Sequence, residues 1–189
     1  MISILITKNQ ALCINSVKTH RKTTVEKIVL FKLQKSLINI LRDKDKIGII
    51  FKRCFQKISK TISISGEQVV VGIDDELLFQ DVITTEESLS NEDAWEYINW
   101  IANQRWGEHG SQYSTFAQNY TRTPNEYQLY SCPNNLINGI KNNLKEINAH
   151  PLWMGPFSEI LLESDKNDKN IFIFDQGKSY FLVGRNKVG

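Results

Sequence analysis

The sequence has few of the features that mark a membrane-spanning or secreted protein. It contains no run of roughly 18 consecutive apolar residues, and no basic leader is followed by a long apolar segment and a cleavage site. Its three cysteines, Cys13, Cys54 and Cys132, are far apart, and an odd number cannot form a complete set of intrachain disulfides. We therefore expect a chain without a membrane span, located in a reducing, cytoplasmic compartment.

An excess of charge of one sign is also missing. Lysine and arginine number 23 and aspartate and glutamate 21, which leaves a formal net charge of +2. A dedicated nucleic-acid binder has to neutralise many phosphates, so this balance predicts that no nucleic acid is bound. The densest basic run, residues 18–22, is interpreted as a solvated hairpin.

Complete catalytic and metal-binding motifs are absent from the sequence. Neither a Gly-x-x-x-x-Gly-Lys-Ser/Thr loop nor a Gly-x-Gly-x-x-Gly after a strand occurs, and the three histidines lack metal-ligand spacing to a cysteine or to another histidine. Residues 74–76 form a compact acidic turn, but one such turn supplies too few oxygens for a hard cation. Solvation and helix capping explain that turn better, so we expect neither a metal site nor an enzyme.

The hydrophobic pattern of the first half predicts an α/β domain. Five segments carry the prediction. Residues 2–6, 11–14 and 25–33 are expected to form three opening antiparallel strands, residues 47–62 a helix with one buried stripe, and residues 69–71 a central strand. A further strand at residues 77–83 is expected to return beside the central strand through the turn at residues 74–75. Residues 35–41 fit a helix and an extended segment equally well.

The second half continues the alternation of helices and strands. Ser90 and Asp93 resemble a capping box, which predicts that a helix begins there. Pro133 is suited to the start of a second helix because its missing N–H is not needed there. Strands are expected at residues 114–120, 127–132, 170–175 and 180–183. With 41% hydrophobic residues, the 189-residue chain is expected to form a single α/β domain over residues 1–189, or one lobe of a larger protein.

Tryptophans are distributed around the predicted helix that follows Ser90. In an ordinary domain most such residues complete the core, so we expect two or three of the four tryptophans to be buried and one to be left for contact. The acidic start of the helix and its aromatic side form the candidate partner-binding site. Its residues are Glu92, Trp95 and Trp100.

A second candidate site is the segment Asp175-Gln-Gly177-Lys-Ser179. An aspartate at the end of a strand, followed by a glycine turn, can orient phosphate or bound magnesium. A structural hairpin also favours glycine where the backbone turns sharply. Asp175, Gly177 and Ser179 therefore support a nucleotide-binding hypothesis beside a purely structural interpretation.

Four segments, in their order along the chain, resemble the first lobe of actin-like assembly proteins. These proteins include the PilM-like component of type IV pilus machines and the cytoplasmic part of the type II secretion platform protein. Residues 69–73 with 78–83 look like a strand pair of that family, and residues 89–95 look like the start of its acidic helix. Residues 140–150 resemble a helix-to-strand passage, and residues 171–177 look like its strand and phosphate-side turn.

The resemblance implies an actin-like, ribonuclease-H-like mixed sheet with flanking helices. In nucleotide-competent relatives the first hairpin carries Asp-x-Gly near the phosphates, whereas this sequence has Ile-Thr-Lys-Asn-Gln at residues 6–10. The resemblance, together with this missing motif, therefore implies a scaffold that acts without ATP or magnesium. The expected partner is a protein, such as a membrane-anchored component of a pilus or secretion assembly, which contributes a helix or an extended peptide.

Two other interpretations stay open at this stage. The first is a partial or degenerate nucleotide-dependent phosphotransferase that uses the Asp175–Gly177 turn, and it requires ATP and magnesium to bind. The second is a small binding protein of unrelated fold, associated with a toxin or restricted to one lineage. Only the topology of the chain can separate this last interpretation from the actin-like one.

Overall fold

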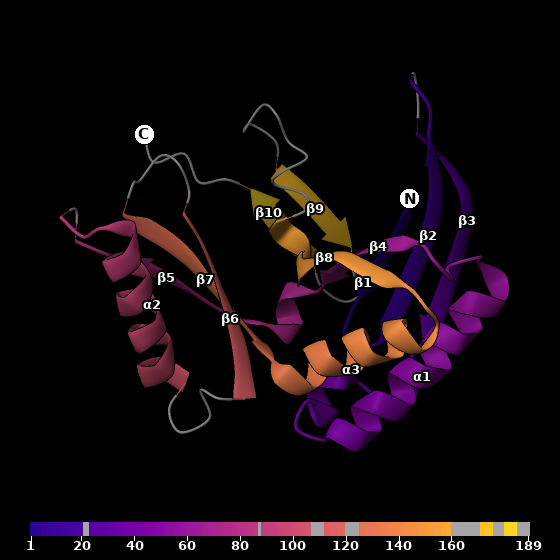
Figure 1. The fold of residues 1–189 in the computed structure, drawn as a ribbon, viewed down its shortest axis with the longest axis horizontal. Coiled ribbons are helices and arrows are strands. Elements are labelled where there is room, and N and C mark those ends of the chain that lie inside the picture. The colour runs from indigo at the N-terminus through magenta and orange to yellow at the C-terminus, as the bar shows by residue number, and fades with distance from the viewer. Residues whose placement is uncertain are drawn as a thin grey trace.

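The computed structural model describes residues 1–20, 23–86, 88–106, 112–119, 125–159, 171–175 and 180–184. Its described part contains a five-stranded sheet, a three-stranded sheet and a two-stranded hairpin. Two helices pack on the five-stranded sheet and one on the three-stranded sheet, as Figure 1 shows. No helix of the described residues is long and apolar enough to cross a membrane.

The five-stranded sheet has the order β3-β2-β1-β4-β8. β1 (Ile2–Ile6), β2 (Gln10–Lys18) and β3 (Thr23–Lys32) form an antiparallel meander, which confirms the three predicted opening strands. β4 (Gln68–Ile73) and β8 (His150–Pro156) run parallel to β1 and complete a mixed sheet.

One face of this sheet packs under α1 (Lys44–Thr61) and α3 (Asn134–Glu146). The predicted helical stripe over residues 47–62 is confirmed, because its apolar residues recur on one side and are buried. Asp43 caps α1 by accepting a hydrogen bond from the backbone N–H of Lys46 at 3.0 Å. The ambiguous segment at residues 35–41 contains a short 3-10 helix, Leu37–Ile40.

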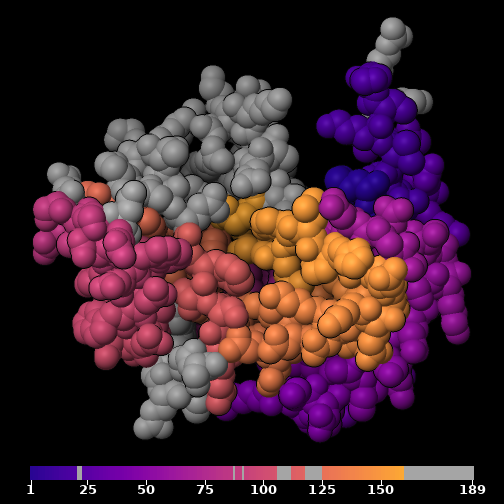
Figure 2. Space-filling view, in the orientation of Figure 1, coloured from indigo at the N-terminus to yellow at the C-terminus, as the bar shows by residue number. Residues whose placement is uncertain are grey.

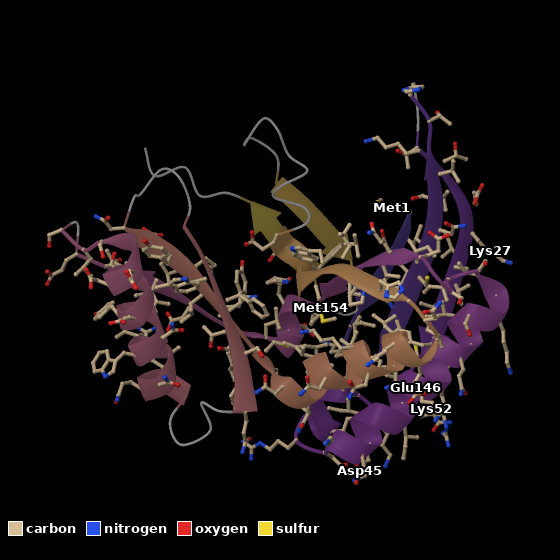
Figure 3. All side chains as sticks on the ribbon, in the orientation of Figure 1. Met1, Lys27, Asp45, Lys52, Glu146 and Met154 are labelled. Carbon is tan, nitrogen blue, oxygen red and sulfur yellow. The ribbon has the colours of Figure 1, made fainter. Side chains whose placement is uncertain are left out.

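A glycine allows α1 and α3 to approach closely. A Cβ atom built on Gly139 of α3 would lie 2.5 Å from Cγ2 of Ile47 on α1, which is closer than two carbon atoms can pack. Lys52 on α1 and Glu146 on α3 form an ion pair at 3.5 Å on the outer side of the same contact, where Figure 3 labels both. The space-filling view in Figure 2 shows α3 in orange at the front of the molecule.

The three-stranded sheet has the order β5-β7-β6 and is antiparallel throughout. Its strands are β5 (Phe79–Thr84), β6 (Tyr113–Asn119) and β7 (Glu126–Pro133). α2 (Asn91–Trp106) packs on one face and builds a second, smaller core with Ile83 and Leu129. The predicted capping box is confirmed: the backbone N–H of Asp93 donates to Ser90 Oγ at 3.2 Å, and Ser90 Oγ donates to Asp93 Oδ2 at 2.6 Å.

The prediction that residues 77–83 return beside β4 is wrong. β4 lies between β1 and β8, so both of its edges are already paired and no edge is left for β5. A 3-10 helix at Asp75–Leu77 redirects the chain, and β5 pairs with β7 in the other sheet. β8 was not predicted from its own residues, because prolines at positions 151 and 156 argue against a strand; β8 is an edge strand, where proline is tolerated.

The last described strands are β9 (Ile171–Asp175) and β10 (Tyr180–Gly184). They pair antiparallel with each other, which confirms the two strands predicted there. The charged loop predicted at residues 165–169 lies outside the described residues. Along the longest axis of the molecule, β3 lies toward one end and α2 at the other (Figure 1).

Candidate functional site

The carboxyl ends of β1, β4 and β8 lie together at one end of the five-stranded sheet, because these three strands are parallel. We call this end the carboxyl edge. Open α/β sheets bind their ligands outside such strand ends, so this is where a nucleotide would be expected. The polar side chains of the carboxyl edge therefore decide what can bind there.

The turn between β1 and β2 uses its own backbone donors. Thr7 Oγ1 accepts hydrogen bonds from the backbone N–H groups of Asn9, at 3.4 Å, and Gln10, at 3.2 Å. The backbone N–H of Thr7 donates to the Gln10 carbonyl at 2.8 Å. A phosphate-binding turn needs free N–H groups directed at the anion, whereas these three already have acceptors within the turn.

The side-chain ammonium of Lys8, in the same turn, forms an ion pair. Lys8 Nζ lies 2.6 Å from Glu76 Oε2, in the 3-10 helix that follows β4. The pair is about two-thirds buried, with one third of each side chain exposed. Lys8 therefore links the first turn to the acidic turn across the carboxyl edge.

Asp75 is the central buried acid of the carboxyl edge, with 5% of its surface exposed. Its carboxylate accepts hydrogen bonds from Ser158 Oγ at 2.5 Å, from the backbone N–H of Ser158 at 3.1 Å and from Gln80 Nε2 at 2.9 Å. Burial raises the pKa of Asp75, although the two bonds from Ser158 act in the opposite direction. Asp75 thus ties the segment after β4 to the segment after β8.

The acidic turn was expected to be solvated and to cap a helix. Capping is confirmed for Asp74, but solvation is wrong for both aspartates, because Asp74 is 4% and Asp75 5% exposed. Asp74 caps the 3-10 helix by accepting from the backbone N–H of Glu76 at 3.1 Å, as predicted. Asp75 is buried rather than solvated, because it serves a contact with a residue 83 positions away. No local pattern signals Asp75 or Ser158, so sequence reasoning missed both.

A second buried contact joins the two sheets. Tyr130 on β7 donates its hydroxyl to Glu159 Oε1 at 2.7 Å, just beyond β8. A cavity of about 60 Å³ lies between Ile73 and Met154 of the larger sheet and Phe116 and Cys132 of the smaller one. Sites for cofactor-sized ligands usually measure about 300–1,000 Å³, so this cavity is too small for a nucleotide.

Metal-ligating groups do not gather in the described part of the chain, where no cluster of three or more His, Cys, Asp or Glu residues occurs. The three cysteines are buried, and they form no disulfide with one another. Burial raises the pKa of each thiol to about 12, so all three remain protonated at neutral pH.

The nucleotide-binding candidates fall at the limit of the described residues. Asp175 is the last residue of β9 and pairs with Tyr180, the first residue of β10. Gly177 and Ser179 lie outside the described residues. The nucleotide-binding hypothesis for these three residues therefore stays a prediction.

The partner-binding candidates lie on the outer side of α2. Trp95 is 46% exposed, Trp100 is 56% exposed, and Glu92 is also exposed. A helix turns by about 100° per residue, so Trp95 and Trp100 point about 140° apart, while Glu92 and Trp95 are neighbours three positions apart. The candidate residues thus form two flanks of one helix, with Glu92 and Trp95 on one and Trp100 on the other.

The expectation that most tryptophans complete the core is wrong for Trp95 and Trp100. Smaller residues fill the buried stripe of α2, namely Ala94, Ile98 and Ala102. Trp95 and Trp100 lie outside this buried stripe, on the flanks of the helix. α2 therefore presents large aromatic surface to solvent.

Comparisons with known proteins identify the fold. No family model matches the sequence, and no curated protein matches it. Among solved structures, the chain is similar to the cytoplasmic domain of EpsL, an inner-membrane component of the type II secretion system of Vibrio cholerae, with a TM-score of 0.62 and 7% identity. It is also similar to a structure of the PilM–PilN type IV pilus biogenesis complex, with a TM-score of 0.58 and 9% identity.

The matches cover nearly all of this chain but only part of the other chains. The EpsL match covers 97% of this chain and 67% of the other, and the pilus match covers 91% and 53%. The chain therefore spans between half and two thirds of the structures it resembles. Its fold is the actin-like mixed sheet with flanking helices that the sequence resemblance predicted, and the interpretation as an unrelated fold is excluded.

Proposed function

We propose that the chain is a partner-binding scaffold domain of a pilus-type or secretion-type membrane assembly, acting on the cytoplasmic side through protein contacts. The observation that carries the proposal is its similarity, over nearly all its length, to the cytoplasmic domain of an inner-membrane secretion component. At 7% identity this similarity concerns the fold, so the assignment of function rests on how the carboxyl edge and α2 are built.

Related folds hold a nucleotide at the carboxyl edge. In this chain the polar groups of that edge support a structural role instead. The N–H groups of the first turn are bonded to Thr7 and Gln10, Lys8 is paired with Glu76, and Asp75 is held by Ser158. Each of these polar groups serves a contact within the protein. This arrangement favours a scaffold over the alternative of a degenerate nucleotide-dependent phosphotransferase built around Asp175.

The outer side of α2 supports a role in binding. Aromatic side chains are enriched at the centres of protein interfaces and cost free energy when left in water. Trp95 and Trp100 are both about half exposed, and acidic residues including Glu92 accompany them. We assign the partner contact to Glu92, Trp95 and Trp100, with a membrane-anchored component of the assembly as the partner.

Site-specific photo-crosslinking in cells tests this assignment. A photoreactive amino acid at position 95 is expected to capture an inner-membrane component of the same assembly, identified by mass spectrometry. Position 49 on α1 is the matched control, because Ile49 is also apolar and 53% exposed but lies far from α2. Capture of the same proteins from both positions, or of none from position 95, counts against the proposed contact.

A further inference from the structure

The five-stranded sheet has a second apolar face. Side chains alternate along a strand, so the residues between those that pack under α1 and α3 point to the opposite side. On β3, Ile28 is 60% exposed and Leu30 is 44% exposed, and their partners across the ladder are Ile14 and Leu12 of β2. No described helix packs on this face. We call these four residues the β3 patch.

The surroundings of the β3 patch are basic. Lys32 is exposed and lies two positions after Leu30, so it points to the same face of β3, and Lys18 is exposed at the end of β2. The one acidic residue of these strands, Glu26, accepts a hydrogen bond from Asn15 at 3.0 Å. An apolar patch with a basic border favours a partner that combines apolar side chains with carboxylates.

The small net charge hides a strong separation of charge along the chain. Residues 1–65 contain 14 lysines and arginines and only three acidic residues, whereas residues 66–189 contain nine basic and 18 acidic residues. The first segment builds β1 to β3 and α1, and the second begins with β4 and includes α2. Within the second segment, residues 79–133 include β5, α2, β6 and β7 and contain eight acidic and two basic residues. The end of the molecule that carries α2 is therefore acidic, and the end that carries β3 is basic.

α2 carries the complement of the β3 patch. Tyr97 is 39% exposed, and its ring lies 6.0 Å from that of Trp100, centroid to centroid, with 30° between the planes. Glu96 is exposed and lies one helical turn before Trp100, on the same flank. We call Glu96, Tyr97 and Trp100 the α2 flank.

We propose that the α2 flank of one copy of this chain docks on the β3 patch of a second copy. The two surfaces lie at opposite ends of the molecule (Figure 1), so they cannot meet within one chain. A contact between two different surfaces is head-to-tail, and it leaves one free patch and one free flank at the ends of every open assembly. The inference rests on the proposed function in taking α2 as a contact helix. It refines that function by giving the flank of Trp100 to a second copy, which leaves the flank of Glu92 and Trp95 to the membrane-anchored component.

Sedimentation of the purified chain over a range of concentrations, at low and at high salt, tests the proposal. The wild-type chain is expected to form species larger than a dimer as concentration rises, and salt is expected to weaken them because charges border both surfaces. The double variants Ile28→Ser/Leu30→Ser and Glu96→Lys/Trp100→Ala are each expected to remain monomeric. Circular dichroism establishes that both variants are folded. Ile49→Ser is the matched control and is expected to associate like the wild type.

Mixing the two double variants is the decisive step. Each retains one competent surface, so an equimolar mixture is expected to form a discrete dimer although neither variant associates alone. A mixture that stays monomeric, or a wild-type chain that is monomeric throughout, overturns the proposal. Wild-type chain that stays monomeric but co-sediments with phosphatidylglycerol vesicles, and loses that binding with Ile28→Ser/Leu30→Ser, assigns the β3 patch to a membrane instead. None of these outcomes depends on the membrane-anchored partner, which is tested separately at position 95.

Discussion

Asp75 shows at the scale of one residue how the carboxyl edge is stabilised. A carboxylate removed from water is costly unless hydrogen bonds compensate it, and here three donors from Ser158 and Gln80 do so. The contact spans 83 positions in the sequence and joins the segments that follow β4 and β8. Asp75 therefore serves the stability of the fold, and its charge is not free to act on a ligand.

Replacing Asp75 with alanine is expected to lower the free energy of unfolding by about 2–3 kcal/mol, because the buried Ser158 donors lose their acceptor. Urea unfolding followed by circular dichroism measures this loss. Asp45→Ala on the exposed side of α1 is the control and is expected to change stability by about 0.5 kcal/mol or less. A small effect at Asp75 would show that the edge is open to water.

The raised pKa of Asp75 predicts a dependence of stability on pH. The folded state binds its proton more tightly than the unfolded state, whose pKa is near the ordinary value of 3.8. The stabilisation is therefore present below pH 3.8 and is lost as pH rises through the folded pKa. The neutral variant Asp75→Asn is expected to flatten this slope in urea unfolding measured from pH 3.5 to 7. An unchanged slope contradicts the assignment.

Two glycines show at the scale of helices how α1 and α3 pack. Gly139→Ala places a Cβ against Ile47 and is expected to destabilise the protein by about 1–3 kcal/mol. Gly48→Ala on α1 meets nothing within 4 Å and is expected to stabilise the protein by about 0.5–1 kcal/mol, because alanine favours the helix. Thermal unfolding of the two variants should give midpoints that move in opposite directions. Shifts of the same sign contradict the packing described for α1 and α3.

Most helices and strands could be predicted because their own residues determine them. The stripe of α1, the capping box of α2 and the alternating strands of the first meander all depend on neighbours in the sequence. The partners of β5 could not be predicted in this way, because pairing depends on which edge is free after β8 has paired with β4. β8 itself was not predicted, because it contains two prolines, which a strand tolerates only at the edge of a sheet.

Less of the candidate site than of the fold could be predicted from the sequence. The missing Asp-x-Gly at residues 6–10 was visible in the sequence, but the use of the turn's N–H groups by Thr7 required coordinates. Trp95 and Trp100 were contact candidates from the sequence, but the exposure of both was not predicted, because only one of the four tryptophans was expected to remain outside the core. Residues far apart in the sequence, such as Asp75 and Ser158, carry no local signal of their contact.

At the scale of the whole molecule, the chain combines an actin-like fold with a carboxyl edge whose described polar groups bond within the protein. Calorimetric titration of the chain with ATP and magnesium is expected to show no saturable heat, because the polar groups of the carboxyl edge are bonded within the protein. Asp175→Ala is the control that decides whether any signal belongs to the β9–β10 turn. Saturable binding that this variant abolishes would support the phosphotransferase alternative.

The most direct test of the proposed scaffold role is the affinity of the chain for the cytoplasmic segments of membrane-anchored pilus-type or secretion-type components from the same organism, measured by calorimetric titration. The account predicts saturable binding to one of these segments that Trp95→Ala weakens by about tenfold or more. It also predicts that Ile49→Ala and the addition of ATP with magnesium leave that binding unchanged. Binding that requires ATP, or that is indifferent to Trp95 and to the Glu92→Lys variant, would contradict the account of this chain as a scaffold that acts through α2.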